Sequence, residues 1–398
     1  MSRLIDISPY ILCGTIFALA LPLLLSLKAL ISSKSKANQV STKSFEPPKG
    51  WWTDTKRFSA EQRAIFSQTW LCVSHRSRFT KAGDYIALDI AGFRVLFMLG
   101  KDGVVRAFHN ICRHRAFPVA KKASGSATIL GCKYHGWSYN TKGELTKAPH
   151  FEDVAGFDKS QNGLFPIHTK TDDNGFIHIN LSSSSEAGET KPANAKIIGR
   201  LARINPNQQF LGSWEVKGKF NWKVTGNNVD GEIPLAHFTN LFSRFFGSPS
   251  AGKIRFSPLT TVYTQSGSPI WYQLTYSPES VRQTMVRCDV YSRTQTSTHA
   301  FDESVKSNLE NQVQSLVQKY EDTYAKLISS GHEVPEDFDE QAMIAGMVNA
   351  HLKKEKSEGA EIKPAAVKSC HSDGYTKAEG ICKALEGVES LGDLGCCD

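Results

Sequence analysis

The stretch CRHRAFPVAKKASGSATILGCKYHGW, residues 112–137, contains two short segments that each bring one cysteine close to one histidine. In the first segment a single residue separates Cys112 from His114. In the second, two residues separate Cys132 from His135, and seventeen residues lie between the two pairs. Because thiolates and imidazoles are both metal ligands, this spacing predicts a metal centre held between two loops.

Two kinds of metal centre use two cysteines and two histidines. Tetrahedral zinc is one, but zinc fingers usually take their two cysteines from one short motif and their two histidines from another. A Rieske [2Fe–2S] centre is the other, in which two histidines replace two cysteines on one of the irons. Each short segment here supplies one thiolate for one iron and one imidazole for the other. The pattern therefore favours a Rieske centre, and structural zinc is the alternative.

The stretches HNICRHRAFP (109–118) and LGCKYHGWSYNTKGEL (130–145) resemble the Rieske loops of ring-hydroxylating and choline-monooxygenase-type oxygenases. The resemblance extends over residues 50–365. It implies a Rieske-type [2Fe–2S] cluster with these ligands: Cys112, His114, Cys132 and His135. It also implies O₂ activation at a mononuclear Fe(II). Because no Gly-rich dinucleotide fingerprint follows a predicted strand, we expect electrons from NAD(P)H to arrive through a separate reductase.

The mononuclear iron site is predicted in the stretch NNVDGEIPLAHF, residues 227–238. The family has an acidic residue here and then two histidines, whereas this chain has the single histidine His237, with Glu232 at the position of the other. The resemblance implies that His237, Glu232 and Glu310 bind the iron. It implies that Asp230 carries electrons from the cluster of a neighbouring subunit to the iron.

Three interpretations of that stretch remain open. The site binds iron through one imidazole and two carboxylates; or it holds iron weakly or not at all; or the gene has lost an activity that it once had. Carboxylates suit Fe(II), which is compatible with the first interpretation. For Glu310, at the edge of the apolar face of a long predicted helix, the alternative to a ligand is a solvated charge.

The N-terminal region contains an uncharged run of seventeen residues, Ile11–Leu27. With its flanks, up to Ile31, it approaches the roughly 30 Å thickness of a bilayer core. Lysines follow it, so the positive-inside rule predicts a single-pass membrane anchor with the rest of the chain in the cytosol. A cleaved secretory signal peptide is the alternative.

The fold class predicted for the chain is α+β. An all-β Rieske domain should precede a catalytic domain in which, as the resemblance implies, an antiparallel sheet grips a long helix. Apolar periodicity predicts that long helix over residues 304–328 and a second helix over residues 339–356. The expected segments are a membrane anchor (1–31), a linker (32–50), the Rieske domain (51–185), the catalytic mononuclear-iron domain (195–365) and a flexible, cysteine-containing tail (366–398).

Composition narrows the function further. The chain has 398 residues, of which 40% are hydrophobic and 22% are charged, as expected for globular protein. Its net charge of +8 is scattered rather than gathered in a stripe with aromatic residues, which excludes a nucleic-acid partner. The resemblance implies a Rieske-type oxygenase that oxidises a small organic molecule, and we expect it to act in specialised metabolism. The resemblance implies a homotrimer. The alternative function is a membrane-tethered Rieske electron-transfer protein, or a non-catalytic homologue.

Overall fold

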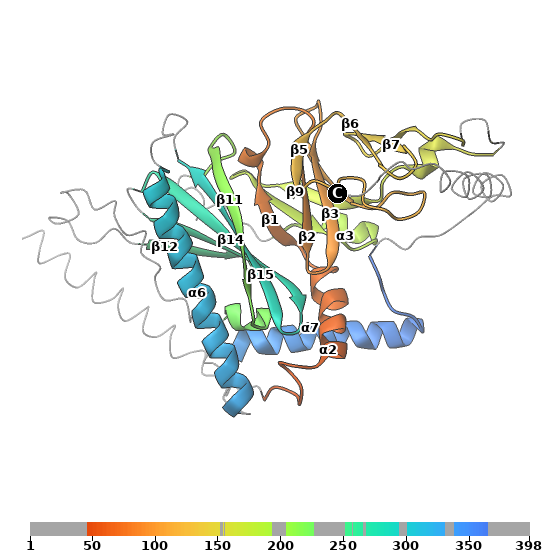
Figure 1. The fold of residues 1–398 in the computed structure, drawn as a ribbon. Coiled ribbons are helices and arrows are strands. Elements are labelled where there is room, and N and C mark those ends of the chain that lie inside the picture. Colours follow the sequence, from red (N-terminus) through yellow and green to blue (C-terminus); the bar gives the residue numbers. More distant parts are fainter. Residues whose placement is uncertain are drawn as a thin grey trace, which may run out of the picture. The chain divides into compact units, whose positions relative to one another are not determined.

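The computed structural model describes residues 46–151, 154, 156–192, 204–226, 251–256, 258–265, 268–293, 301–330 and 338–364. By its internal contacts the chain divides into two units, Met1–Glu46 and Pro47–Asp398, and the description below concerns the second. Its elements are antiparallel sheets and a few helices, in agreement with the predicted α+β class (Figure 1). No observation tests the predicted domain boundaries, which remain a prediction.

The first part of the chain forms a seven-stranded sheet in the order β1-β10-β9-β4-β3-β2-β5 and a three-stranded sheet in the order β6-β7-β8. The turn between β2 and β3 is tight, because Ala91 and Gly92 both have positive φ, as in the turns that favour two-residue hairpins. The strands are β1 (Leu71–His75), β2 (Asp84–Ile90), β3 (Phe93–Leu99), β4 (Val105–His109), β5 (Ser124–Ser126), β6 (Ile129–Gly131), β7 (Ser138–Asn140), β8 (Leu145–Lys147), β9 (Pro166–Thr171) and β10 (Phe176–Asn180).

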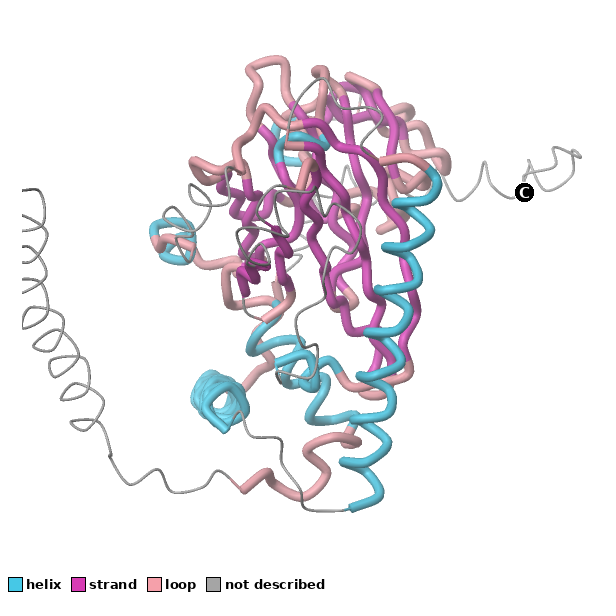
Figure 2. Tube along the Cα trace, turned by 90° about the vertical axis from the view of Figure 1, so that its left-hand side faces the viewer, coloured by secondary structure: helices cyan, strands magenta, loops and turns pink. Residues whose placement is uncertain are grey.

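The later part of the chain forms a five-stranded antiparallel sheet in the order β11-β15-β14-β13-β12. The long helix α6 (Glu303–Ser330) lies along one face of this sheet (Figures 1 and 2). Its apolar stripe packs there, so residues such as Val313 and Tyr320 are fully buried. The helix predicted over residues 304–328 is thus confirmed. The strands are β11 (Gln209–Gly218), β12 (Ala251–Phe256), β13 (Thr260–Gln265), β14 (Ile270–Ser280) and β15 (Gln283–Ser292).

Segments from both ends of the unit meet at the helix α7 (Phe338–Glu358). The presence of α7 confirms the second predicted helix. Arg63 donates to both oxygens of Glu355 at 2.6 and 3.1 Å, which ties the first helices to α7. The remaining helical segments are short. They are α2 (Thr55–Glu61), the π-helix η1 (Gln62–Phe66), the 3₁₀ turns η2 (Arg76–Arg78), η3 (Lys159–Asn162) and η4 (Trp222–Gly226), and α3 (Ser185–Glu189).

A buried charge network joins the two large sheets. Asp289 on β15 is fully buried and accepts hydrogen bonds from Arg78, from Arg287 and from the hydroxyl of Ser213. Burial alone would raise the pKa of Asp289, but Arg287 and Arg78 hold it below its usual value. The Arg287 guanidinium also donates to the carbonyl of Val73 on β1, so the same network reaches the first sheet.

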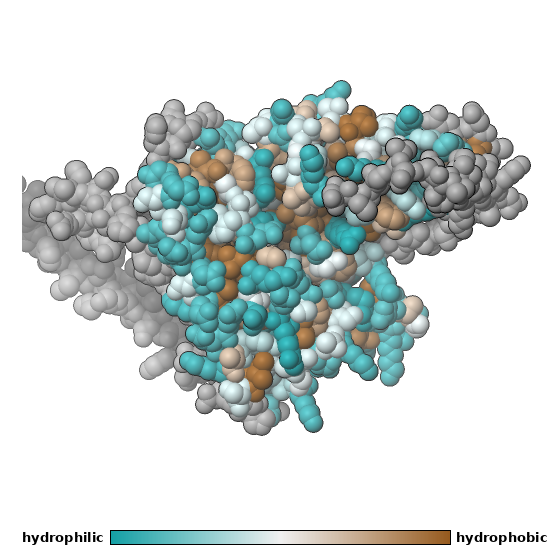
Figure 3. Space-filling model, in the orientation of Figure 1, coloured by the Kyte–Doolittle hydropathy of each residue, from teal (hydrophilic) through white to brown (hydrophobic). Residues whose placement is uncertain are grey.

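The predicted membrane localisation is corrected by the structure. None of the helices within the described ranges combines the length and the apolar run that crossing a bilayer requires. The exposed faces of α6 and α7 carry charged side chains, and the surface in Figure 3 is mostly hydrophilic with small, separate hydrophobic patches. The run that suggested an anchor, within residues 1–31, lies outside the described residues, as does the tail (366–398). We therefore drop the membrane assignment.

Candidate functional site

The two cysteine–histidine loops repeat one backbone arrangement, shifted by twenty residues. In the first loop, the amide of Cys112 donates to the carbonyl of Phe117 (2.7 Å), and the amide of Ala116 donates back to the carbonyl of Cys112 (3.0 Å). In the second loop, the amide of Cys132 donates to the carbonyl of Trp137 (2.8 Å), and the amide of Gly136 donates back to the carbonyl of Cys132 (2.9 Å).

Both loops turn at a residue in the left-handed region, Ala116 (φ 59°) and Gly136 (φ 71°). For alanine this conformation is strained by about 1 kcal/mol or more. The strain is retained because the turn brings the cysteine and histidine that precede it in one loop next to those of the other loop. The two loops therefore present matched Cys–His pairs, as the sequence predicted.

The two cysteine thiols lie against each other in a buried position. Cys112 is 3% exposed and Cys132 is 4% exposed. Contact with the Cys112 thiol, together with the backbone N–H groups of Tyr134 and His135, lowers the pKa of Cys132 to about 6, although burial opposes this. The same contact, together with burial, raises the pKa of Cys112. One thiol of the pair is therefore easily deprotonated, which suits thiolate ligands.

The two histidines of the loops also lie side by side. The ring centroids of His114 and His135 are 4.5 Å apart. His114 stacks on the fully buried ring of Trp137, with a centroid distance of 5.1 Å and an angle of 9° between the planes. The pairing of two thiols with two imidazoles fits a [2Fe–2S] cluster, in which each iron takes two ligands of one kind from the protein.

Tyr139 is a residue of this site that the sequence did not single out. Its hydroxyl lies 3.3 Å from the Sγ atom of Cys112 and accepts a hydrogen bond from the amide of Arg113 at 3.1 Å. Because the backbone amide can only donate, the phenolic hydrogen is available to the sulfur. Burial, followed by the nearby Cys112, raises the pKa of Tyr139, so the hydroxyl stays protonated as a donor. No spacing rule relates Tyr139 to the cysteines.

The predicted mononuclear iron site is described only in part. Asp230, Glu232 and His237 lie outside the described residues. Glu310 is half-buried on α6, and the thiol of Cys288 is fully buried on β15. The pKa of that thiol is raised by burial first, then by Asp289 and by Glu310. Glu310 follows the buried Leu309 on α6 and lies one turn before the buried Val313, at the edge of the stripe that packs on the sheet. Among the described residues, no group of three or more His, Cys, Asp or Glu side chains is arranged to hold a metal ion.

The segment that leads into the predicted iron site is anchored by a buried ion pair. Lys223 Nζ donates to Glu61 at 2.6 Å, and the indole of Trp222 donates to the same carboxylate at 2.9 Å. Gln341 on α7 donates to the carbonyl of Lys223, and Asn221 donates to the carbonyl of Val281. This segment ends at Gly226, which directly precedes residues 227–238 in the sequence.

Comparison with protein families matches residues 69–158 to the Rieske [2Fe–2S] domain. The chain contains a Rieske domain. The matched range includes both cysteine–histidine loops and most of the seven-stranded sheet. The match favours the Rieske interpretation of the four ligands over structural zinc.

The curated relatives that this chain matches are oxygenases. It is 29% identical over 182 residues to the carnitine monooxygenase oxygenase subunit of Acinetobacter baumannii, covering 46% of this chain and 49% of the relative. It is 30% identical over 200 residues to the chloroplastic choline monooxygenase of Atriplex hortensis, covering 48% and 45%. The chain thus matches about half the length of these relatives. The expected resemblance to Rieske-type oxygenases is confirmed.

Solved structures similar to this chain share its fold. A quaternary ammonium Rieske monooxygenase in complex with gamma-butyrobetaine aligns with a TM-score of 0.62 and 22% identity, covering 77% of this chain and 94% of that one. A second structure, of a quaternary ammonium Rieske monooxygenase described as giving insight into carnitine oxidation by gut microbiota and inter-subunit electron transfer, aligns with a TM-score of 0.53 and 20% identity. It covers 87% of this chain and 95% of that one. The β domain followed by a sheet with a long helix is therefore the Rieske oxygenase fold.

The cofactor prediction is confirmed at the level of the family. A Rieske domain and oxygenase relatives imply a [2Fe–2S] cluster, a mononuclear iron and a separate source of electrons. The two thiols of Cys112 and Cys132, with the two imidazoles beside them, fit the cluster. The assignment of individual ligands remains a prediction, which we carry into the proposal below.

Proposed function

We propose that this chain is the oxygenase component of a Rieske non-haem iron system, which uses O₂ and NAD(P)H-derived electrons to oxidise a small organic molecule. The main support is the pair of matched Cys–His loops within a Rieske oxygenase fold. When bound, the cluster supplies single electrons and the mononuclear iron supplies O₂ activation. An electron carrier without oxygenase chemistry is not favoured, because the matched relatives are monooxygenases and dioxygenases.

In this proposal the two loops hold the cluster through four side chains. The thiolates of Cys112 and Cys132 bind one iron and the imidazoles of His114 and His135 bind the other. The backbone N–H groups of Tyr134 and His135 point at the sulfur of Cys132, and the hydroxyl of Tyr139 points at that of Cys112. Such donors stabilise negative charge on sulfur, and therefore favour the reduced cluster.

The iron site in this proposal consists of His237, Glu232 and Glu310, and Asp230 provides the link for electrons. The half-buried position of Glu310, one turn before the buried Val313, supports its role as a ligand. In the quaternary assembly, Asp230 would lie between the cluster of one subunit and the iron of the next. A homotrimer is the assembly that we propose, and the inter-subunit electron transfer described for a quaternary ammonium Rieske monooxygenase of the same fold supports an oligomer.

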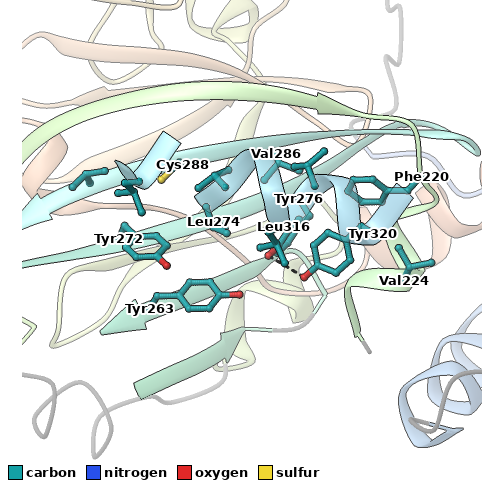
Figure 4. Close-up of a cluster of buried hydrophobic side chains, with 14 of the residues drawn as sticks. Phe220, Val224, Tyr263, Tyr272, Leu274, Tyr276, Val286, Cys288, Leu316 and Tyr320 are labelled. Atoms are coloured by element: carbon teal, nitrogen blue, oxygen red, sulfur yellow. Dashed lines mark hydrogen bonds between the residues drawn. The ribbon is translucent and has the colours of Figure 1, made fainter. Parts of the chain in front are cut away.

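We further infer that the substrate is a cation of the trimethylammonium class. The buried core between the five-stranded sheet and α6 is rich in tyrosine, as Figure 4 shows. Tyr263 and Tyr272 stack with centroids 5.0 Å apart, and the hydroxyls of Tyr276 and Tyr320 approach to 3.4 Å. Aromatic rings attract quaternary ammonium groups through cation–π interactions. Relatives named for carnitine and choline support the same class. A role in specialised metabolism has no support and is not part of the proposal.

Metal analysis combined with turnover tests the proposal. Fully loaded protein should contain about three irons per chain, two in the cluster and one mononuclear. With a reductase, NADH and O₂, it should convert choline, carnitine or gamma-butyrobetaine in preference to a neutral isostere in which carbon replaces the ammonium nitrogen. Active protein with about two irons per chain would contradict the iron-site assignment, and equal turnover of the isostere would contradict the cationic substrate.

A further inference from the structure

The 3₁₀ turn η4, which precedes the predicted iron-site segment in the sequence, contacts both α6 and α7. Val224 of η4 is fully buried and belongs to the same core cluster as Tyr320 of α6, as Figure 4 shows. The helix α6 also carries the predicted ligand Glu310. The main chain of η4 is bound by α7 instead, because the carbonyl of Lys223 accepts a hydrogen bond from Gln341. The turn η4 therefore connects the helix that carries one predicted ligand to a second helix.

Gln341 forms its part of this connection with both ends of its side-chain amide. The residue is fully buried in the first turn of α7. Its Nε2 atom donates to the carbonyl of Lys223 at 3.0 Å, and its Oε1 atom accepts from the indole of Trp51 at 2.9 Å. A shift of Lys223 away from α7 would leave a buried donor unpaired, which is costly because water cannot replace the lost partner. Gln341 therefore fixes the main chain of η4.

The neighbouring residue, Glu340, lies against the end of the same turn. A Cβ atom on Gly226 would collide with Oε2 of Glu340, so glycine is what leaves room for the carboxylate there. The other oxygen, Oε1, accepts a hydrogen bond of 3.3 Å from Arg255 on β12. Arg255 also reaches the hydroxyl of Thr225 at 3.4 Å. The first turn of α7 thus contacts η4 at two points, the carbonyl of Lys223 and the backbone of Gly226.

The affinity of a metal site depends on how accurately its ligands are held, and residues behind the ligands contribute to this. In the proposed function, Glu232 and His237 belong to residues 227–238, whereas Glu310 belongs to α6. The chain enters the first of these parts directly after Gly226. A residue that holds η4 against α7 can therefore influence the iron without being a ligand.

We propose that Glu340 and Gln341 are positioning residues for the mononuclear iron. They hold the chain at Lys223 and Gly226, while Val224 holds the same turn against α6. The predicted ligands that follow Gly226 then start from a fixed point relative to the ligand on α6. The inference rests on the proposed function, because it assumes that this chain binds a mononuclear iron.

Fe(II) titration of the full-length, cluster-loaded protein tests the role of Gln341. Gln341→Met keeps the volume of the side chain but removes both hydrogen bonds. The dissociation constant of the mononuclear Fe(II) should rise at least about tenfold, because supporting residues have effects of this size on metal affinity. The EPR spectrum of the nitric oxide adduct of this iron should change, while the spectrum of the reduced Rieske cluster should not.

The matched control is Gln208→Met, which breaks an amide–indole bond of the same kind elsewhere in the core. Gln208 is buried and accepts from the indole of Trp271 at 2.7 Å. Trp271 points to the opposite face of β14 from Tyr272, which packs in the cluster with α6. Urea denaturation should show a similar loss of stability in both variants. Only Gln341→Met should change the Fe(II) affinity and the nitric oxide spectrum.

A double-variant experiment tests the role of Glu340. Gly226→Ala and Glu340→Ala should each weaken Fe(II) binding, because each removes the same carboxylate from its place over the turn. The combined variant should bind Fe(II) no more weakly than the weaker of the two, since effects that share one cause do not add. Glu340→Gln retains the size of the side chain and an acceptor for Arg255, so it should bind Fe(II) nearly as well as the wild type.

Hydrogen–deuterium exchange gives a readout that needs no mononuclear iron. Before Fe(II) is added, Gln341→Met should speed the exchange of backbone amides in peptides covering residues 222–238, because the turn has lost its attachment to α7. Gln208→Met should leave exchange in these peptides at the wild-type rate.

Two results would contradict this account, and they differ in what they overturn. If the wild type binds a mononuclear iron but Gln341→Met and Gln208→Met match in Fe(II) affinity, nitric oxide spectrum and exchange, the inference fails alone. Additive losses in Gly226→Ala and Glu340→Ala would likewise remove Glu340 from it. If fully loaded wild type holds only about two irons per chain, the proposed function and the inference fail together.

Discussion

The Nζ atom of Lys223 lies 2.6 Å from Oε1 of Glu61, and the two side chains are 1% and 0% exposed. Burial lowers the pKa of Lys223, although Glu61 opposes this effect. The pair joins the end of α2 to the segment that precedes the predicted iron site. Removing one partner leaves the other charged and buried, which costs far more than losing an exposed ion pair.

Glu61→Gln should therefore lower the free energy of unfolding by about 3–5 kcal/mol, as measured by urea denaturation. The matched control is Glu279→Gln, which breaks the exposed pair with Lys217 at 2.9 Å and should cost less than about 1 kcal/mol. Adding Lys223→Met to Glu61→Gln should recover part of the loss. Equal effects of Glu61→Gln and Glu279→Gln would contradict this account.

Acid should destabilise the protein through His75. The ring is fully buried; Nε2 donates to the carbonyl of Asn174 at 2.9 Å, and Nδ1 accepts from the amide of Ser77 at 3.2 Å. Burial lowers the pKa of His75 to about 4, so the folded state binds fewer protons than the unfolded state between pH 4 and pH 6.5. Stability due to the neutral ring is complete above about pH 6.5 and is lost as the pH falls toward 4, by about 3 kcal/mol in total.

The measurement is the free energy of unfolding at a series of pH values between 7 and 4. His75→Gln should be less stable at pH 7 but should show a shallower decrease toward pH 4, because one group that titrates on unfolding is gone. The buried residue Phe256, which does not titrate, serves as the control, since Phe256→Leu should lower the stability but leave the slope unchanged. A slope that is identical in wild type and His75→Gln would exclude this residue as the cause.

Substitution of a cluster ligand should abolish the Rieske centre. Purified protein should be brown, with the absorption and the low average g-value of a Rieske cluster, and Cys112→Ser or His135→Ala should remove both signals. Cys72→Ser is the control, because Cys72 is equally buried but lies on β1 outside the loops. Colourless protein containing stoichiometric zinc would refute the cluster assignment.

The hydroxyl of Tyr139 should tune the potential of the cluster. Tyr139→Phe removes the donor that lies 3.3 Å from the Cys112 sulfur. Since this donor stabilises the more negative, reduced cluster, the reduction potential should fall by on the order of tens of millivolts, while the spectrum is retained. Redox titration followed by EPR measures the change. Tyr85→Phe alters another buried tyrosine ring nearby and should leave the potential where it was.

The iron-site assignment predicts different effects for two glutamates on α6. Glu310→Ala should abolish product formation and lower the iron content by about one per chain, with the Rieske spectrum intact. Glu303→Ala, which removes an exposed carboxylate from the same helix, should leave both unchanged. The same logic predicts loss of turnover for His237→Ala, weaker iron retention for Glu232→Ala and slow turnover with both metals retained for Asp230→Asn. Retained activity in Glu310→Ala would exclude it as a ligand.

The sequence by itself determined the cluster loops and the helices. Cys112, His114, Cys132 and His135 could be found because ligand identity and short spacing are local properties of the chain. The helices α6 and α7 could be found because apolar periodicity over many residues is also local. The uncharged run that ends at Leu27 was equally local, and it led to a membrane assignment that the described residues do not support.

Only the tertiary structure decided which distant residues meet. Nothing in the spacing of Glu61 and Lys223, or of Arg78 and Asp289, marks them as partners, because each pair forms when separate segments pack and exclude water. Tyr139 reaches the Cys112 sulfur through the pairing of β6 with β7, and Gln341 comes to donate to the carbonyl of Lys223. Burial and electrostatic environment depend on the packed chain, so pKa shifts and buried hydrogen bonds between distant segments cannot be read from the order of residues alone.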